Sequence, residues 1–545
     1  MGCSSTTTYS RADYSNAEIR AIEIKNIAKN LEEKPVYSLW KAWLLKNKDV
    51  AASDLFNDCV NYCADLYARA CESDDYINAF RYCNTLKIVA PEKVEKISCD
   101  KYFDNTYSFT ANTIPEDEHV KISRFLNGTV TIWINLGVKV ERGLGYANRV
   151  IGSGFFIGKD GWIITNYHVI ADTVDPSYKG YSRLYIKLFS DPDTRIPARV
   201  VSYDKSLDLA LLKTEIDAPY TFTLGSSTSL DVGDTIYAIG SPIGLNSTIT
   251  SGIVSSFDRK VMSTASIIQI DAAVNAGNSG GPLINKKGEV QGIVFAGIPD
   301  YQGLNFAIPV EYLKTVLPRL FNCSNKVTDT DEKIIIPQEI HSSWIGAYGK
   351  TYKLQGDPKG RGVQVLYTMP GGSCDLAGIR SGNIITHINQ KKIASVEELQ
   401  NELIALPPEM VTTLTIRIAE AVNQKDTNKM LSYEKPIYLA IRPEYPGVQM
   451  RERDSETHLM YPFLGMKLKP ASAKKRSQCI VDSIVKGSIA DESGFSKNDS
   501  VTVKATELSA DKNFLLIEFF TKKRKSGYLD VNLMVGAPMD SPLFF

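Results

Sequence analysis

A serine in a glycine-rich turn is the feature that most constrains this chain. Residues 277–283 read Gly-Asn-Ser-Gly-Gly-Pro-Leu, with glycines on both sides of Ser279. Glycine reaches backbone conformations that other residues avoid, so such a turn can bring amide N–H groups toward an incoming carbonyl. The segment therefore predicts an exposed, nucleophilic serine, although the same residues alone could form an ordinary turn.

A serine hydroxyl needs a base, and the base needs a third group that orients it. Of the five histidines, His168 follows a β-branched, strand-like segment, and Asp208 lies forty residues later between apolar residues. A carboxylate there is costly without a partner, and an imidazole N–H is a natural one. The order His, Asp, Ser is one of the known orders of a catalytic triad. Separately these residues could be a strand end, a loop edge and a turn, but together they predict a triad.

Six further motifs follow in order around the serine turn. They are Gly-Ser-Gly-Phe-Phe-Ile at 152–157, Thr-Asn-Tyr-His-Val-Ile at 165–170, Gly-Ser-Pro-Ile-Gly-Leu at 240–245, Thr-Ser-Gly-Ile-Val-Ser at 250–255, Gln-Ile-Asp-Ala-Ala-Val-Asn at 269–275 and Asn-Phe-Ala-Ile-Pro at 305–309. Over residues 125–323 the chain thus resembles the HtrA (DegP-like) family of trypsin-fold serine proteases. It departs from the family pattern at Ala276, where proline is usual, and in a longer segment at 176–184.

The resemblance implies acyl transfer to water, with Ser279 as nucleophile, His168 as base and Asp208 orienting the histidine. The backbone N–H groups of Gly277 and Ser279 would form the oxyanion hole, and Asn278 would hold the turn between them. No metal or cofactor is required for this chemistry.

The same resemblance places a substrate pocket beside the triad. Since its residues include no acid, a basic P1 side chain would be buried without a partner, and a small or branched aliphatic P1 residue fits better. Such residues are exposed mainly in unfolded chains, which suggests a role in protein quality control. The predicted pocket residues are Ala273, Val274, Phe295, Ala296, Gly297 and Leu304.

The region after the protease contains two similar modules that resemble PDZ domains. In the first, Trp344, Ile345, Gly346 and Ala347 would present backbone N–H groups to the C-terminus of a peptide, which adds as a strand. The alternative is a plain strand start. The second module repeats the pattern more faintly, and Asn498 takes the place of the usual glycine, which predicts an altered turn.

The N-terminal region has helical periodicity and one hairpin that resembles a tetratricopeptide repeat. One hairpin does not make a solenoid, so we expect a small helical bundle used for interaction or assembly. Cys59, Cys63, Cys71 and Cys83 lie there without a nearby histidine, which favours buried apolar cysteines over a metal site.

The first residues bear on localisation. Met-Gly-Cys-Ser-Ser fits a bacterial lipoprotein start with Cys3 as the lipidated residue, and with Thr6 it also fits an N-myristoylation pattern. Because the family is mostly periplasmic, we expect a periplasmic or envelope protein anchored through Cys3; a cytoplasmic protein is the alternative. The balanced charge, 62 basic and 62 acidic residues, argues against a nucleic-acid partner.

The fold class expected is a multidomain chain with an α-helical N-terminal domain, a chymotrypsin-like double β-barrel and two α+β PDZ domains. The expected boundaries are residues 1–120, 121–323, 335–445 and 455–545. Partners would be unfolded or C-terminally exposed proteins, and the family suggests a homo-oligomer built from trimers. The alternative function is a proteolytically latent, chaperone-like or scaffolding protein that binds C-terminal peptides.

Overall fold

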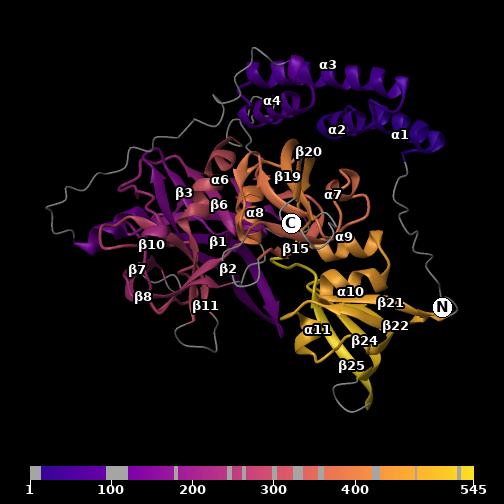
Figure 1. Ribbon diagram of the computed structural model, residues 1–545. Coiled ribbons are helices and arrows are strands. Elements are labelled where there is room, and N and C mark those ends of the chain that lie inside the picture. The colour runs from indigo at the N-terminus through magenta and orange to yellow at the C-terminus, as the bar shows by residue number, and fades with distance from the viewer. Residues whose placement is uncertain are drawn as a thin grey trace. The chain divides into compact units, whose positions relative to one another are not determined.

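The computed structural model describes residues 14–93, 121–176, 182–241, 248–259, 265–297, 304–322, 336–353, 361–419, 430–472, 475–523 and 529–545. The chain forms two compact units (Figure 1). One contains residues 1–70, 78–97 and 342–545, and the other contains residues 71–77 and 98–341. Cys3 and the greater part of segment 176–184 lie outside the described residues.

Strands between residues 129 and 309 form two six-stranded antiparallel barrels, which confirms the double β-barrel prediction. The first barrel closes because β5 pairs with β6, and the short strand β13 (Gln338–Glu339) adds to β5 in parallel. Its strands are β1 (Thr129–Glu141), β2 (Leu144–Gly158), β3 (Trp162–Thr165), β4 (Arg183–Leu188), β5 (Ile196–Asp204) and β6 (Leu209–Thr214). Those of the second are β7 (Thr235–Gly240), β8 (Thr248–Arg259), β9 (Ile267–Ile270), β10 (Pro282–Ile284), β11 (Val290–Gly297) and β12 (Asn305–Pro309).

Each barrel encloses its own apolar core. Ile132, Phe156 and Leu212 belong to the first core, and Ile268 and Leu283 belong to the second. β-Branched and aromatic residues favour these pleated, buried strands. Helix α5 (Tyr167–Val174) follows β3, and α6 (Val310–Asn322) follows β12. The barrels therefore hold fixed the loops that carry His168, Asp208 and Ser279.

The first PDZ module is a sheet in the order β14-β20-β19-β17-β16-β15, so β15 is an edge strand. Helix α8 has an N-cap serine, Ser395, whose hydroxyl accepts a hydrogen bond from Glu398 N. The elements are β14 (Ser343–Trp344), β15 (Ala347–Thr351), β16 (Val363–Thr368), α7 (Ser373–Leu376), β17 (Ile384–Ile388), β18 (Lys391–Lys392), α8 (Val396–Ala405), β19 (Met410–Ala419) and β20 (Met430–Ile441).

The second module repeats the turns of the first. Gly346 and Gly465 have φ angles of +76° and +75°, and each carbonyl accepts a bond from the next strand, at Met369 N and Val485 N. Its elements are α9 (Pro446–Arg453), α10 (Glu456–Leu464), β21 (Met466–Ser472), β22 (Lys475–Ile484), α11 (Ile489–Glu492), β23 (Ser500–Leu508), β24 (Phe514–Lys523) and β25 (Leu529–Pro538).

The prediction that Asn498 alters the turn is wrong. Asn498 adopts φ +71° and donates to Val481 O, just as Gly382, at φ +96°, donates to Val365 O. Asparagine tolerates this left-handed conformation better than most residues, so the turn survives the loss of glycine.

Helix α8 of the first module has no counterpart in the second. α8 lies between β18 and β19, whereas β23 passes to β24 through residues 509–513 without a helix. The helix opposite the edge strand is thus found in the first module, and the second is a continuous meander from β21 to β25.

Four α-helices are described before the barrels: α1 (Ala17–Asn30), α2 (Pro35–Leu45), α3 (Val50–Glu72) and α4 (Tyr76–Val89). α2 packs on the β19–β20 hairpin, where the Trp40 indole N–H donates to Pro436 O at 3.2 Å and Tyr37 meets the Tyr438 ring edge-on. Cys59 and Cys63 are fully buried free thiols, as expected for apolar cysteines. Cys71 is only half-buried, and Cys83 is disulfide-bonded, so the prediction is wrong for Cys83. Within the described ranges, no helix is long and apolar enough to cross a membrane.

Candidate active site

The serine turn joins β9 to β10 and is held from both barrels. Gly277 and Gly280 have φ angles of +103° and +86°, which glycine alone adopts without strain. From β2, Ser153 N donates to Ser279 O at 2.8 Å, and Ser153 Oγ donates to Gly277 O at 2.6 Å. Gly280 N donates to Val294 O at 2.8 Å on β11. The position of Ser279 is therefore fixed by several backbone contacts.

Position 281 requires glycine because a side chain would not fit there. A Cβ at this position would lie 2.0 Å from Ile239 O and 3.0 Å from Asn278 O, and both are backbone atoms. We expect Gly281→Ala to destabilise the peptidase region by about 1–3 kcal/mol, as overpacking commonly does. Calorimetric unfolding would show this as a lower melting transition for that region. Gly536→Ala is the control, because a Cβ at this position would meet only a Leu516 methyl at 3.9 Å. We expect it to leave the temperature of every unfolding transition unchanged.

His168 and Asp208 meet through two hydrogen bonds. His168 is the second residue of α5, and Asp208 immediately precedes β6 with a φ of +53°. His168 N donates to Asp208 Oδ1 at 2.8 Å, and His168 Nδ1 lies 2.7 Å from Asp208 Oδ2. The Asp208 side chain is 9% exposed and that of His168 is 46% exposed. The buried carboxylate can thus fix both the orientation and the tautomer of a half-exposed imidazole.

Neighbouring polar groups hold Asp208 in place. Asn166 Nδ2 donates to Asp208 O at 2.9 Å. Asp204 begins the same turn, and its Oδ1 accepts from Ser206 N, Ser206 Oγ and Leu207 N. Burial raises the pKa of the Asp204 carboxyl above its usual value, against the effect of these bonds. Sequence reasoning assigned no role to Asp204 or Ser153, although Ser153 lies within the motif at 152–157 and Asp204 is four residues before Asp208.

Ser279 Oγ does not bond to His168 in this conformation. It donates to Phe295 O at 3.0 Å, and the Phe295 and His168 rings meet edge-on with centroids 6.2 Å apart. The described residues include no hydrogen bond between Ser279 and His168. Proton transfer to the imidazole would therefore need a rotation of the serine side chain.

The predicted oxyanion hole has two backbone N–H groups without an acceptor among the described residues. Asn278 N donates to Asn275 O at 3.0 Å and closes the turn. Gly277 N and Ser279 N have no hydrogen-bond acceptor among the described residues. Open N–H donors on the nucleophile itself and two residues before it are the arrangement that a developing oxyanion requires.

The predicted pocket residues come from three segments beside the serine turn. Ala273 is exposed and Val274 half-buried in the loop after β9, while Phe295, Ala296 and Gly297 end β11 and the half-buried Leu304 precedes β12. β11 pairs with β12, and Asn305 Nδ2 donates to Ala272 O at 2.8 Å, which joins the three segments. No group of three or more His, Cys, Asp or Glu residues in the described part of the chain could hold a metal.

Family models match four parts of the chain. A trypsin-like peptidase domain matches residues 152–293, a PDZ domain matches 333–417, and a TP0546 family PDZ domain matches 447–539. A domain of unknown function (DUF8517) matches residues 18–102. The first three matches fall on the barrels and the two modules described above.

Two similar relatives are each named "Probable periplasmic serine endoprotease DegP-like". That of Hahella chejuensis is 34% identical over 261 residues, covering 46% of this chain and 50% of the relative. That of Ectopseudomonas mendocina is 35% identical over 263 residues, covering 47% of this chain and 52% of the relative. The chain spans about half the length of the curated relatives it matches.

Among solved structures, an HtrA-type protease AlgW with decapeptide is 22% identical, with a TM-score of 0.45. The match covers 59% of this chain and 98% of the AlgW chain. A TM-score this low does not establish a shared arrangement of the domains. The chain thus has a trypsin-like peptidase domain followed by two PDZ domains, and about half of it is similar to DegP-like serine endoproteases.

Proposed function

We propose that the chain is a serine endoprotease that hydrolyses peptide bonds in unfolded or C-terminally exposed proteins. The observation that carries this proposal is the pair of hydrogen bonds between His168 and Asp208, beside a glycine turn that presents Ser279. DegP-like relatives are named serine endoproteases, which supports the same conclusion.

The geometry supports the following sequence of proton transfers. With its Nδ1–H bonded to Asp208, His168 keeps Nε2 free to accept the Ser279 proton as Oγ attacks the scissile carbonyl. The N–H groups of Gly277 and Ser279 stabilise the oxyanion, and each such donor contributes on the order of 3 kcal/mol. His168 then gives the proton to the leaving amine, and water hydrolyses the acyl-enzyme.

A latent resting state is the second candidate, and the bond from Ser279 Oγ to Phe295 O favours it. In that case peptide binding or assembly would shift a population toward a conformation in which Ser279 faces His168. A protein that never reaches that conformation would act as a chaperone or scaffold.

Degradation of casein, with and without a hydrophobic peptide, tests the proposed function. An active protease digests casein, and a latent one does so only when the peptide is present. Native and reduced, carboxymethylated lysozyme form a matched pair, and we expect only the unfolded form to be cleaved. Suppressed aggregation without cleavage under every condition would favour the chaperone-like alternative.

We expect cleavage after small or branched aliphatic P1 residues. None of the six predicted pocket residues is acidic, so a lysine or arginine would lose its hydration without an ion pair. In a peptide library we expect Val, Ile, Ala and Leu at P1 to exceed Lys and Arg by at least about tenfold. Cleavage mainly after basic residues would contradict this pocket assignment.

We also propose that peptide binding belongs to the first PDZ domain, through Trp344, Ile345, Gly346 and Ala347. The second domain lacks the helix that faces the edge strand in the first. The names of the relatives support a periplasmic location. Lipidation of Cys3 and assembly into trimers remain predictions.

A further inference from the structure

The last residues of the sequence pair with the edge strand of the first PDZ domain. Ala347 N donates to Phe545 O at 2.8 Å, Phe545 N donates to Ala347 O at 2.9 Å, and Gly349 N donates to Leu543 O at 3.1 Å. Tyr348 and Phe544 form the matching antiparallel bridge. Residues 543–545 therefore occupy the open side of β15, as an added peptide strand would.

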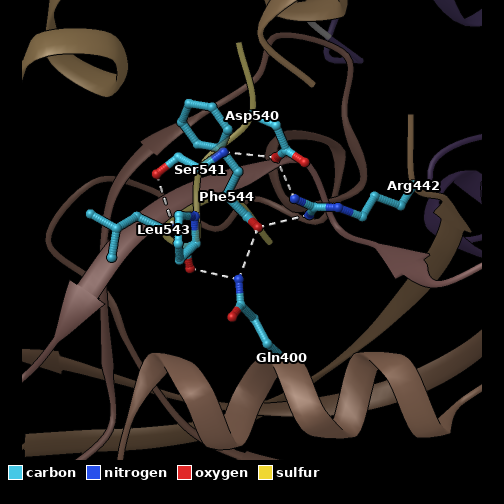
Figure 2. A network of polar contacts seen from close by, with 7 residues as sticks. Gln400, Arg442, Asp540, Ser541, Leu543 and Phe544 are labelled. Atoms are coloured by element: carbon cyan, nitrogen blue, oxygen red, sulfur yellow. Dashed lines mark hydrogen bonds and ion pairs between the residues drawn. The ribbon is translucent and has the colours of Figure 1, made fainter. Parts of the chain in front are cut away.

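Two side chains of the same domain hold this segment. From α8, Gln400 Nε2 donates to Pro542 O at 2.6 Å. Arg442, directly after β20, donates to Phe544 O at 2.8 Å and to Asp540 Oδ1 at 2.6 Å (Figure 2). The Arg442 side chain is only 7% exposed, so its bonds form away from water, where charged hydrogen bonds are strong. The segment is thus bound from the strand side and from the helix side.

The two terminal aromatic side chains have different surroundings. Phe545 is fully buried, and a Cβ on Gly349 would lie 2.7 Å from its ring, so the ring packs against the edge strand. Phe544 is also fully buried and meets the rings of Tyr348 and Phe463, as part of a core shared by the two PDZ domains. Phe545 does not belong to that core, so its side chain can be changed with less effect on it.

We propose that residues 542–545 are an intramolecular ligand of the first PDZ domain, and that an incoming peptide must displace them. The ligand class follows from the occupant: an extended segment with large apolar, preferably aromatic, side chains. The inference rests on the proposed peptide-binding role of residues 344–347. It concerns binding alone, so its test does not depend on hydrolysis.

Competition within one chain is strong because the ligand is tethered. β25 ends at Pro538, and Met539 is anchored by bonds to Asn513 and Gly447, so the segment begins beside its site. A short tether gives an effective concentration on the order of millimolar. The apparent affinity for a free peptide is the intrinsic affinity multiplied by the fraction of first PDZ domains whose site is not occupied by the segment.

The test measures binding of a fluorescein-labelled pentapeptide, Ser-Pro-Leu-Phe-Phe, to the full chain by fluorescence anisotropy. Two variants open the site: Phe545→Ser, and a chain that ends at Ser541. We expect both to bind the peptide about 10- to 100-fold more tightly than the wild type. Phe514→Ser is the matched control, because Phe514 is 51% exposed on β24, and should bind as the wild type does.

Three outcomes would overturn the proposal. Wild-type binding as tight as that of the variants would mean that the segment does not occupy the site in solution. Folded variants that bind no better would mean that the site does not accept this sequence. Sedimentation showing an assembly that dissociates in Phe545→Ser would assign the segment to a neighbouring copy. If the variants bind the peptide more tightly but no protein hydrolyses casein, the proposed intramolecular ligand would stand and the proposed protease function would be rejected.

Discussion

Ser279→Ala is expected to reduce hydrolysis of casein to the assay background. Removal of the nucleophile of a triad lowers kcat by about five to six orders of magnitude in comparable serine proteases. The turn itself should persist, because it is held by hydrogen bonds from Ser153 N, Ser153 Oγ and Gly280 N that the substitution leaves intact. Initial rates on fluorescent casein, measured for both proteins at equal concentration, check this expectation.

The control for this prediction is Ser190→Ala. Ser190 is exposed in the same region, and its hydroxyl makes no hydrogen bond with another described residue. We expect the control to have wild-type activity and both variants to keep their melting transitions. If Ser279→Ala retained a tenth of the wild-type rate, Ser279 would not be the nucleophile.

Asp208→Asn is expected to lower kcat by about 10⁴-fold with little change in stability, as the equivalent change does in a well-studied triad. Asparagine can keep the bond from His168 N and tolerates the φ of +53°. Its amide N–H₂, however, would face His168 Nδ1 in place of the carboxylate oxygen. The histidine would then carry its proton on Nε2 and could not accept one from Ser279.

Asp217→Asn provides the matched control for the carboxylate. Asp217 is exposed in the loop after β6, so the loss of one negative charge alone should not alter the rate. Steady-state kinetics on a peptide substrate separate kcat from KM. A rise in KM with unchanged kcat for Asp208→Asn would assign Asp208 to substrate binding and contradict its role in orienting His168.

Much of the fold could be predicted because local motifs encode its turns. The double barrel and the two PDZ modules could be predicted because short glycine-containing segments resemble the motifs of known families. The second module shows the limit of this reasoning. Asn498 was expected to alter a turn, but the turn depends on a backbone conformation that asparagine also reaches.

Other features depend on contacts between residues distant in sequence. Nothing near Ser279 indicates that its hydroxyl would bond to Phe295 O, because β11 brings that carbonyl from another part of the barrel. The pairing of Phe545 with Ala347 joins residues almost two hundred positions apart, through a single short segment without periodicity. The hydrogen bond from Trp40 to Pro436 O likewise joins residues that are distant in sequence, so no local pattern predicts it.

Covalent labelling by a fluorophosphonate tests the central claim most directly, because this probe reacts only with a serine that a neighbouring base activates. Intact mass and peptide mapping would be recorded for the wild type, His168→Ala and Phe545→Ser, each with and without the pentapeptide. The account predicts one adduct on Ser279, absent in His168→Ala, with labelling increased where the peptide site is occupied by free peptide. A folded wild type that gains no adduct under any of these conditions, or an adduct on another residue, would contradict it.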